Sequence, residues 1–507
     1  MLAKVNSGAN VGLLGVPVTV EVDIASSGLP SFIIVGLADR AVEESKERVR
    51  AAIRNCGADF PARKITVNLA PADLPKEGPS YDLPIALGLL LASGQINSQF
   101  FDFNITLVVG ELSLNGSLRK TQGILLLAML AEKMGYKRII VPSENAKEAS
   151  IIRGLDVISF DSLEQILRVL LGQEKLSISP KKTFNPSQIK YDYDFSQIKG
   201  QQHAKRALEI AASGGHNVLL KGPPGAGKTM LCRAFPSILS PMSLEEALEV
   251  TKIYSICGKL SSDKPIVSER PFRSPHHTAS YVGIIGGGNF PKPGEVSLAH
   301  RGVLFLDELP EFPRSVLEAL RQPLEDNEVT ISRASGSLTY PSEFILLAAQ
   351  NPCPCGYLGD TKRNCSCLPG QISKYQRKIS GPLLDRIDIY LDVPSLDVDK
   401  LTDTHQAEDS KSIRERVYAA RKTQFKRFGS SKTTNSRMKT NEIKKFCQVS
   451  EDGLNLLKMA ISSLNLSARG YNRVLKLSRT IADLANSSSI KTEHLAEALQ
   501  YRSRDEN

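Results

Sequence analysis

The sequence predicts an α/β fold with more than one domain. Short apolar runs that are typical of buried strands alternate with amphipathic helix patterns along most of the chain. One of these runs, residues 218–220, leads directly into a glycine-rich loop and a further helix. The chain has 507 residues, which is too long for a single core. We therefore expect about two to four domains.

The glycine-rich loop fits the pattern Gly-x-x-x-x-Gly-Lys-Thr at every required position. Its glycines let the backbone turn N–H groups inward, where they form a nest for anionic oxygens. Lys228 is placed to reach the outer phosphates of a nucleotide, and the Thr229 hydroxyl is placed to bind Mg²⁺. The residues expected to hold the nucleotide here are Gly222, Pro223, Pro224, Gly225, Ala226, Gly227, Lys228 and Thr229.

Composition indicates a globular protein without membrane contact. No apolar run reaches the roughly eighteen residues of a membrane span. The N-terminus carries one lysine and soon enters the strand-like run 16–24, unlike a secretory signal. We expect a cytoplasmic enzyme.

The positive charge is concentrated in one stretch. The net charge is +10, and residues 411–445 alone contain twelve Lys or Arg against two Glu. Such a block suits a polyanion such as nucleic acid. A solvated helical surface followed by a linker explains it equally well, so both interpretations stay open.

Residues 1–171 are expected to form the first domain, a compact α/β unit. The patterns predict strands at 18–24, 64–69, 105–111 and 138–141, and helices at 41–56, 82–91, 122–134 and 162–171. Residues 172–193 are polar, interrupted by proline and non-periodic, which predicts a linker.

Two stretches of the first domain resemble Lon-type serine–lysine proteases. Residues 75–80 resemble the nucleophile motif, with Ser80 at the nucleophile position, and residues 110–116 resemble the strand leading to the catalytic lysine. That lysine position is occupied by Leu125, which cannot accept a proton from a hydroxyl. The resemblance implies a Lon-protease-like (ribosomal S5 domain 2-like) domain without peptidase activity, in which Ser80 caps a helix or lies in a turn.

A second nucleotide motif lies at residues 302–308. Four apolar residues form a strand that is followed by Asp307 and Glu308, at the strand end where ligands bind in open α/β sheets. Asp307 is placed to hold Mg²⁺, and Glu308 to orient and deprotonate the attacking water. A helix is expected at 314–326, a hairpin from 328–333 and 338–340, and a buried strand at 344–349.

The region 241–300 is rich in glycine and proline and is too long for a plain connector, which indicates a functional insertion. Its adjacent His276 and His277 suggest a metal site, but sequence neighbours point apart on a strand and no His-x-x-x-His spacing occurs. We favour hydrogen-bonding or substrate-facing roles for both.

The order of these features resembles the AAA+ branch of the magnesium chelatase ATPase subunit and the MCM helicases. The stretches 270–278, 294–300, 351–356 and 380–388 are similar to the magnesium chelatase-like YifB/ComM family. The resemblance implies a three-layer α/β/α AAA+ core over residues 194–395. It also implies that the chelatase subunit lacks both the front domain and the cysteine pairs described below.

The resemblance assigns further roles by position. Ile198 and Gly200 would lie beside the adenine, and Asn351 would touch the γ-phosphate or the attacking water. Arg386 would act as an arginine finger on the neighbouring subunit's nucleotide, with a structural ion pair as the alternative.

Residues 396–507 show helical spacing and are expected to form the helical lid. The chain there contains helix patterns at 441–446, 451–464, 467–484 and 491–502. Arg469 and Arg473 lie one turn apart, so they share a face. One of them, Arg469 by preference, is expected to reach the phosphates.

Four of the eight cysteines are clustered: Cys353, Cys355, Cys365 and Cys367. Two thiolate pairs on a loop can close into a tetrahedral Zn²⁺ site. Redox-labile surface thiols are the alternative.

Together these features predict a Mg²⁺-dependent ring ATPase that binds ATP between subunits. Hydrolysis is expected to move the hairpin and the insertion loops, which would push on a substrate in the pore. The resemblance implies a hexameric helicase that drives branch migration of DNA during transformation. The alternatives are a chelatase-type motor acting on a metal-inserting partner, and a pseudo-protease scaffold whose ATPase regulates assembly.

Overall fold

The computed structural model describes residues 1–97, 101–181, 191–261, 263–288, 291–333, 336–360, 362–395, 407–430, 432–463 and 466–502. The chain divides into two compact units. The first consists of Met1–Asn185 and Leu244–Ser268, and the second of Pro186–Ser243 and Glu269–Asn507. The chain therefore passes from one unit to the other at three points. The predicted domain boundaries at 171, 193 and 395 remain predictions.

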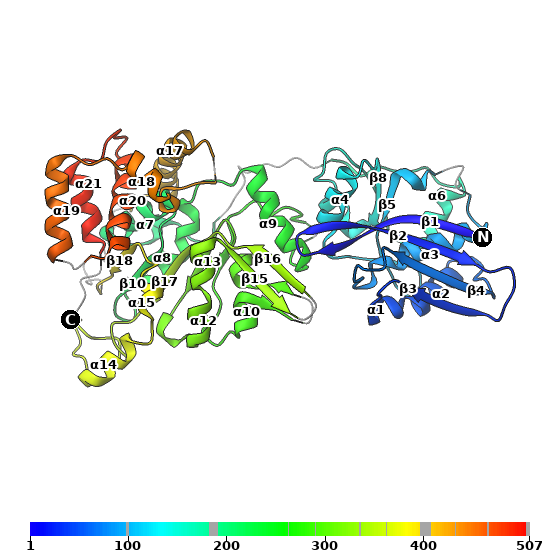
Figure 1. Ribbon diagram of the computed structural model, residues 1–507, viewed down its shortest axis with the longest axis horizontal. Helices are drawn as coiled ribbons and strands as arrows, with labels where there is room; N and C mark the ends of the chain where they lie inside the picture. The colour runs from blue at the N-terminus through cyan, green and yellow to red at the C-terminus, as the bar shows by residue number, and fades with distance from the viewer. Residues whose placement is uncertain are drawn as a thin grey trace. The chain divides into compact units, whose positions relative to one another are not determined.

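The first unit is built on a seven-stranded mixed sheet in the order β3-β4-β2-β1-β5-β8-β9 (Figure 1). β1 pairs with β2 and β2 with β4 in antiparallel fashion, whereas the other neighbours are parallel. The strands are β1 (Leu2–Val11), β2 (Leu14–Ile24), β3 (Ser31–Val35), β4 (Lys64–Ala70), β5 (Thr106–Val108), β8 (Arg138–Pro142) and β9 (Asp156–Phe160). A small separate pair is formed by β6 (Glu111–Leu112) and β7 (Leu118–Arg119).

Helices cover both faces of this sheet. Leu107 and Val108 are adjacent on β5 and fully buried, yet they belong to different apolar clusters, one on each face. The helix α4 approaches the β1–β2 pair closely, since a Cβ at Gly15 would lie only 2.8 Å from the Leu126 carbonyl oxygen. The helices are α1 (Arg40–Glu43), α2 (Ser45–Asn55), α3 (Asp82–Ala92), α4 (Ile124–Lys133), α5 (Ala146–Ala149) and α6 (Leu163–Leu170).

The two positions that resemble protease residues are Ser80, which lies in a turn, and Leu125, which lies in a buried helix. Ser80 lies in a 3-10 turn, Pro79–Tyr81, and its carbonyl accepts a hydrogen bond from the Gly110 N–H at 3.0 Å. Leu125 is fully buried in α4, and its backbone N–H donates to Glu148. The turn placement of Ser80 agrees with the sequence prediction, and the leucine offers no amine.

A segment that follows the phosphate-loop helix folds into the first unit. Helix α9 (Leu244–Ile256) packs on α4, with Val250 and Ile253 buried. The Ser255 hydroxyl donates to the buried Glu148 carboxylate at 2.5 Å, and the Ser255 carbonyl accepts from the Gly123 N–H at 3.1 Å. Part of the predicted insertion therefore belongs to the front unit's core.

The second unit contains a five-stranded parallel sheet in the order β11-β14-β17-β10-β18, of which Figure 1 labels β10, β17 and β18. Alternate residues of its central strands are buried on opposite faces, so the sheet is covered on both sides. The strands are β10 (Val218–Lys221), β11 (Phe272–Arg273), β14 (Val303–Leu306), β17 (Ile345–Gln350) and β18 (Ile389–Asp392). Two further pairs are β12 (Gly286–Gly287) with β13 (Lys292–Pro293), and β15 (Glu328–Arg333) with β16 (Gly336–Pro341).

The C-terminal helices share one apolar core with the sheet. Ile413, Leu475 and Tyr501 are buried in the same cluster as Val218 and Ala207. The helices of this unit are α7 (Gln202–Gly214), α8 (Lys228–Ala234), α10 (Tyr281–Ile285), α11 (Glu295–Leu298), α12 (Arg314–Ala319), α13 (Arg321–Asp326), α14 (Pro369–Gln376), α15 (Gly381–Leu384), α17 (Ser410–Phe428), α18 (Thr440–Phe446), α19 (Glu451–Ser463), α20 (Ala468–Leu484) and α21 (Thr492–Gln500).

Several predicted elements differ from the structure. The helix expected at 314–326 is divided into α12 and α13, and the one at 41–56 into α1 and α2. The strand β1 was not predicted, because polar residues and Gly8 interrupt its alternation. The predicted hairpin is present as β15 and β16, but its turn residues Ala334 and Ser335 lie outside the described residues, as do most of the predicted linker (182–190) and the start of the lid (396–406).

Among the described residues, none of the helices combines the length and apolar character that a bilayer crossing requires.

A buried polar joint connects the sheet to α20. His216 Nδ1 lies 3.2 Å from the Asp388 carboxylate, while His216 Nε2 lies 2.8 Å from the Thr480 hydroxyl on α20. The Arg473 guanidinium lies 3.6 Å from the other Asp388 oxygen. Burial raises the pKa of Asp388, but the His216 hydrogen bond and the cations Arg473 and Lys476 outweigh it, so the pKa of Asp388 falls to about 2.

Replacing Asp388 by asparagine should lower the free energy of unfolding by about 2 kcal/mol at neutral pH. The pKa of Asp388 lies below that of an unfolded aspartate, about 3.9. The contribution is therefore present above about pH 4 and is lost as the pH falls through about 2. Urea denaturation followed by circular dichroism tests this, since the chain has no tryptophan.

The matched control is Asp385→Asn, a half-exposed neighbour that lies 3.9 Å from the Arg469 guanidinium. The Asp385→Asn substitution should change the free energy of unfolding little at any pH. If Asp388→Asn lowered the free energy of unfolding by the same amount at neutral and acid pH, the low pKa of Asp388 would be contradicted.

Candidate functional site

The carboxyl ends of three neighbouring parallel strands meet at one edge of the second unit's sheet. β10 is followed by Gly222, β14 by Asp307 and β17 by Asn351. Because adjacent parallel strands end at the same edge, residues as far apart in the chain as Gly222 and Asn351 are brought together here. The sequence predicted each of these three positions separately.

The phosphate loop has the backbone that the motif requires. Gly225 and Gly227 have φ values of 79° and 88°, which favour glycine, and a Cβ at either would meet nothing within 4 Å. Gly222 is glycine for another reason: a Cβ there would lie 2.1 Å from the Val393 carbonyl oxygen at the end of β18. The loop is therefore open where phosphates would bind and tightly packed where it leaves the strand.

Lys228 lies at the centre of the site. Its ammonium donates to the carbonyls of Gly222 and Pro223 at 2.6 and 2.9 Å, and to Asn351 Oδ1 at 3.2 Å. Burial lowers the pKa of Lys228, against the opposing effect of the Asp307 and Glu308 carboxylates. Each hydrogen bond goes to a neutral oxygen that a phosphate oxygen can replace at greater strength. Lys228 and Asn351 thus point into the same small volume.

Thr229 and Asp307 form the second contact across the site. The Thr229 hydroxyl donates to Asp307 Oδ2 at 2.8 Å, and the Glu308 N–H donates to Asp307 Oδ1 at 3.0 Å. A hydroxyl and a carboxylate at this separation supply the oxygen ligands that Mg²⁺ prefers. These two oxygen ligands fit a magnesium ion that keeps several of its own bound water molecules.

Glu308 has a left-handed backbone, with φ 52° and ψ 48°. Such a conformation is uncommon for residues other than glycine, and it costs of order 1 kcal/mol or more. Its side chain is more than half exposed, and one carboxylate oxygen lies 3.7 Å from His277 Nδ1.

The segment expected beside the adenine lies against the phosphate loop. The Gln201 amide donates to the Ala226 carbonyl at 3.4 Å and to the Pro394 carbonyl at 2.9 Å. Ile198 is buried, and its carbonyl accepts from the Lys205 ammonium at 2.5 Å. Gly200 has φ 62°, which allows the turn into α7. The sequence motifs did not single out Gln201, which makes the contact with the loop.

Arg386 is held within its own chain. Its guanidinium donates to the Pro382 carbonyl at 2.6 Å and forms an ion pair with Glu325, and its side chain is 13% exposed. The structural ion pair considered from the sequence is therefore present. The finger role of Arg386 remains a prediction.

The two lid arginines differ in their surroundings. Arg473 donates to the Ile387 carbonyl at 3.0 Å and belongs to the Asp388 joint. Arg469 is 67% exposed and lies 3.9 Å from Asp385, next to Arg386 in the chain. Neither arginine has a hydrogen bond or ion pair to the phosphate loop among the described residues.

Several arginines of the basic block are used inside the unit. Arg416 pairs with Glu209 and Glu408, and Arg427 pairs with Asp483. Arg414 and Arg421 donate to backbone carbonyls of other elements. The lysines of the block that lie exposed on α17 and α18 are Lys411, Lys422, Lys426, Lys444 and Lys445. Part of the charge excess is therefore structural, and these lysines contribute to the part that faces solvent.

The four clustered cysteines converge on one point. Their Sγ atoms all lie within 4.8 Å of one another, and Cys353 lies 3.4 Å from Cys355 and 3.6 Å from Cys365. Zn–S bonds of about 2.3 Å in a tetrahedron imply S···S distances of about 3.8 Å. Backbone N–H groups of Tyr357 and Ser366 lower the pKa of Cys355, which favours a thiolate. The arrangement fits a tetrahedral metal ion.

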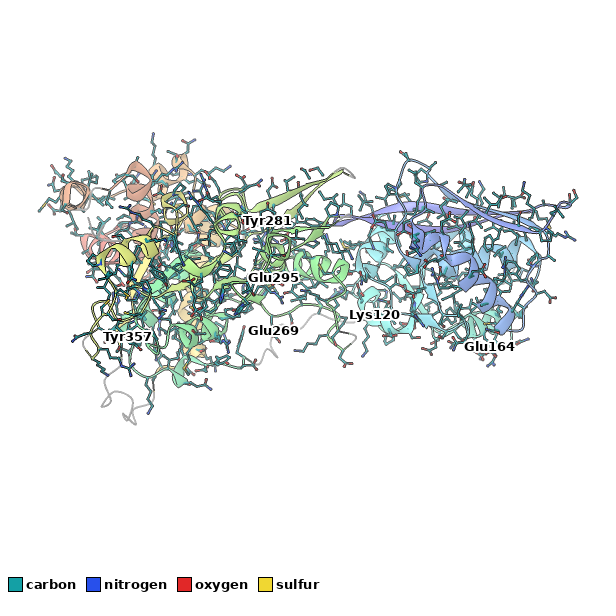
Figure 2. All side chains as sticks on the ribbon, turned by 90° about the horizontal axis from the view of Figure 1, so that it is seen from below. Lys120, Glu164, Glu269, Tyr281, Glu295 and Tyr357 are labelled. Atoms are coloured by element: carbon teal, nitrogen blue, oxygen red, sulfur yellow. The ribbon has the colours of Figure 1, made fainter. Side chains whose placement is uncertain are left out.

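The cysteine loop touches the phosphate loop. Cys353 follows Asn351 by two residues, and a Cβ at Gly356 would lie 2.5 Å from Pro224 Cδ. Tyr357, labelled in Figure 2, follows on the same loop. Folding of the cysteine loop therefore bears on both Asn351 and the phosphate loop.

The two histidines of the insertion have separate contacts. Their ring centroids are 4.1 Å apart, yet His276 Nδ1 faces the Thr278 hydroxyl at 2.8 Å while His277 faces Glu308. Neither belongs to a metal-ligand group among the residues that the structure describes. The His276 contact is a hydrogen bond of the kind expected from the sequence, whereas the 3.7 Å between His277 and Glu308 is too long for one.

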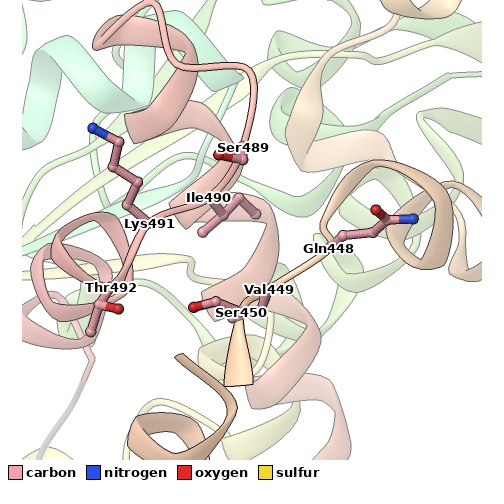
Figure 3. Close-up of a pocket in the computed structure, with 7 residues that line it drawn as sticks. All are labelled: Gln448, Val449, Ser450, Ser489, Ile490, Lys491 and Thr492. Atoms are coloured by element: carbon pink, nitrogen blue, oxygen red, sulfur yellow. The ribbon is translucent and has the colours of Figure 1, made fainter. Parts of the chain in front are cut away.

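A separate hollow of about 410 Å³ lies among the C-terminal helices (Figure 3). It is lined by Gln448, Val449, Ser450, Ser489, Ile490, Lys491 and Thr492. None of these residues belongs to the nucleotide motifs. The hollow lies where short connections precede α19 and α21, so we assign it no catalytic role.

Three family models match successive parts of the chain. They are described as "Magnesium chelatase, subunit ChlI" at residues 194–401, "Subunit ChlI of Mg-chelatase" at residues 20–145, and "Magnesium chelatase, subunit ChlI C-terminal" at residues 407–502. The second match covers most of the front domain.

Similar proteins extend over the whole chain. Competence protein ComM of Haemophilus influenzae is 44% identical, and the match covers 99% of this chain and 97% of that protein. The uncharacterized protein YifB of Escherichia coli is 45% identical over the same shares of the two chains. The magnesium-chelatase 38 kDa subunit of Cereibacter sphaeroides is 25% identical over 32% of this chain and 54% of its own. With this full-length similarity and a chelatase-type AAA+ ATPase domain, the chain belongs to the magnesium chelatase-like YifB/ComM family.

Proposed function

We propose that this chain is a Mg²⁺-dependent ATPase that assembles into a ring, hexameric by resemblance, and moves DNA in the cytoplasm. The work proposed for it is helicase-driven branch migration during recombination of incoming DNA. One observation carries the ATPase part: Lys228, Thr229, Asp307 and Asn351 are hydrogen-bonded to one another in pairs across three strand ends.

The chemistry follows from these positions. Main-chain N–H groups of the loop and the Lys228 ammonium would bind the phosphates. Magnesium held by Thr229 and Asp307 would supply charge neutralisation at the phosphates. Glu308 would orient and deprotonate the attacking water, and Asn351 would hold that water or the γ-phosphate in place.

We propose that the ring is needed for hydrolysis. Arg386 would leave its ion pair with Glu325 and face the nucleotide of the neighbouring subunit. Arg469 lies exposed beside Asp385, on the same part of the surface as Arg386, so it is a candidate for the same boundary. Arg473 would hold helix α20 of the lid in place beside β18 through its ion pair with Asp388.

The DNA part of the proposal is supported by three features. A ComM protein is among the full-length relatives. The hairpin β15–β16 is packed against the insertion, and exposed lysines remain on α17 and α18. Structures of this kind can push on a polyanion that passes along them.

A second candidate is a chelatase-type motor that acts on a protein or metal-inserting partner. The three chelatase-named models favour it, since they match most of the chain. The cysteine cluster and the ComM relative favour the DNA motor.

Glu308→Gln should reduce the ATPase turnover rate by about 10²–10³-fold, because it removes the base but keeps the size of the side chain. Binding of Mg·ATP should stay within about twofold of the parent protein, whereas Lys228→Ala should weaken it by at least about tenfold. Fluorescent-nucleotide titration and phosphate release measure the two effects. Glu311→Gln, three residues further on and paired with Lys378 at 3.0 Å, is the control that should keep turnover.

Forked DNA should bind with an affinity that falls steeply as salt rises, and it should stimulate ATP hydrolysis. Filter binding over a salt series and a parallel ATPase assay with branched DNA measure both. Absence of DNA binding at low salt would favour the chelatase-type motor or the scaffold over this proposal.

We propose that the cysteine cluster holds one structural Zn²⁺. Metal analysis of the purified protein should give about one zinc per chain, and Cys365→Ser should lose it and weaken nucleotide binding, because the loop supports Asn351 and Pro224. Cys257→Ser, outside the cluster, should keep its zinc. Stoichiometric zinc in the Cys365→Ser variant would contradict the assignment.

A further inference from the structure

Helix α17 carries two exposed aromatic side chains on one face. Tyr418 is 56% exposed and Phe425 is 48% exposed. Among the described residues only one other Tyr or Phe side chain, Tyr281, is exposed to this degree. Tyr418 and Phe425 are seven positions apart, which is close to two turns of an α-helix, so their rings share a face. Two large apolar rings on one exposed face indicate a surface that a partner covers.

Lysines are interleaved with the two rings on the same face. Lys422 follows Tyr418 by four residues, and Lys426 follows Lys422 by four, which keeps all three on one side of the helix. Lys411 precedes Tyr418 by seven residues and extends the row toward the start of the helix. All three lysines are exposed. The α17 stripe consists of Lys411, Tyr418, Lys422, Phe425 and Lys426.

The opposite face of α17 is anchored in the second unit. Ile413 and Val417 are buried in the apolar cluster that covers the sheet. The buried Gln424 amide donates to the Ser213 carbonyl at 2.9 Å. Gly429, with φ 66°, ends the helix. The stripe is therefore held in place by the fold, and a partner that binds it pays no cost for ordering the helix.

The charge of α17 is unbalanced. The helix contains seven Lys or Arg and one acidic residue, Glu415. Its arginines form internal contacts: Arg416 pairs with Glu209 at 2.5 Å, and Arg427 with Asp483 at 2.7 Å. Only Glu415 opposes the lysines of the stripe from within the helix. The exposed face is thus complementary to a polyanion.

Positive charge continues from the end of α17 onto α18 (Figure 1). Phe428 of α17 and Phe446 of α18 meet edge to face, with ring centroids 5.8 Å apart. The Lys445 ammonium lies over the Phe446 ring at 5.1 Å, and Lys444 beside it is exposed. A polyanion that follows the stripe therefore meets further lysines where α17 ends.

An unpaired nucleic-acid strand matches this pattern better than a duplex does. The bases of a duplex are stacked on one another, whereas an unpaired strand offers base faces to aromatic rings and phosphates to lysines. At 1.5 Å per residue, the two rings are about 10 Å apart along the helix. That is roughly three times the spacing of successive stacked bases, so the rings would contact different bases.

We propose that the α17 stripe binds one unpaired strand, with one base stacked on Tyr418, another on Phe425 and phosphates beside the lysines. The inference rests on the DNA function proposed above, and it adds the class of nucleic acid and the surface that holds it. A helicase releases unpaired strand as it works. A site for that strand on the motor's own surface would keep it from pairing again.

The test is binding of a dye-labelled oligothymidylate to the full-length protein, followed by fluorescence anisotropy. Tyr418→Ala and Phe425→Ala should each weaken binding about five- to tenfold, because each removes one stacking ring. Tyr418→Phe and Phe425→Tyr keep the ring and should retain the affinity of the parent protein. Met459→Ala, at a 71% exposed position on α19, is the control that should bind as the parent does.

Charge variants should give a different signature. Lys422→Met should reduce the slope of log affinity against log salt by about 0.7, the contribution of one phosphate of a single strand. The ring variants should keep the parent slope. Glu415→Gln should strengthen binding, because it removes the acid that opposes the lysines. An equal loss of affinity for the single strand and for a duplex of the same length in the ring variants would contradict the preference for unpaired bases.

The outcomes separate this inference from the proposed function. A parent protein that binds no nucleic acid at low salt would overturn the DNA function itself. If the parent binds the single strand and the Tyr418→Ala/Phe425→Ala double variant binds it equally well, the inference alone is overturned. The same holds if the double variant binds the strand normally but assembles less well without DNA in mass photometry, since the stripe is then a contact between copies of this chain.

Discussion

The candidate site depends on parallel strand pairing in the second unit. β10 lies between β17 and β18, and β17 lies between β10 and β14. This order places the phosphate loop beside the end of β17 and one strand away from the end of β14. The hydrogen bonds from Lys228 to Asn351 and from Thr229 to Asp307 are the direct result. Because each partner comes from a different strand, the site exists only in the folded unit.

The long connection between the phosphate-loop helix and β14 serves both compact units. Its first part, Leu244–Ser268, belongs to the first unit, where Ser255 donates to the buried Glu148. Its later part passes His277 and packs on the hairpin of the second unit. One continuous piece of chain therefore joins the front unit's core to the neighbourhood of Glu308.

The nucleotide site could be predicted from the sequence because each of its motifs is local: a strand is followed, within a few residues, by the polar residues that it positions. The same applied to the cysteine pairs and to the β15–β16 hairpin. Contacts between distant segments could not be read in this way. The ion pair of Arg386 with Glu325, the pairing of Arg416 and Arg427 inside the basic block, and the place of α9 in the first unit all depend on tertiary packing. β1 was missed because glycine and polar residues break its alternation.

We propose that Lys228, Thr229, Asp307 and Glu308 act together on one Mg·ATP. An experimental structure of the Glu308→Gln variant with Mg·ATP bound would show this directly. We expect the γ-phosphate beside Lys228 and Asn351, with magnesium bound by Thr229 and near Asp307. A nucleotide bound away from the glycine loop, or a metal ion remote from Thr229 and Asp307, would contradict it.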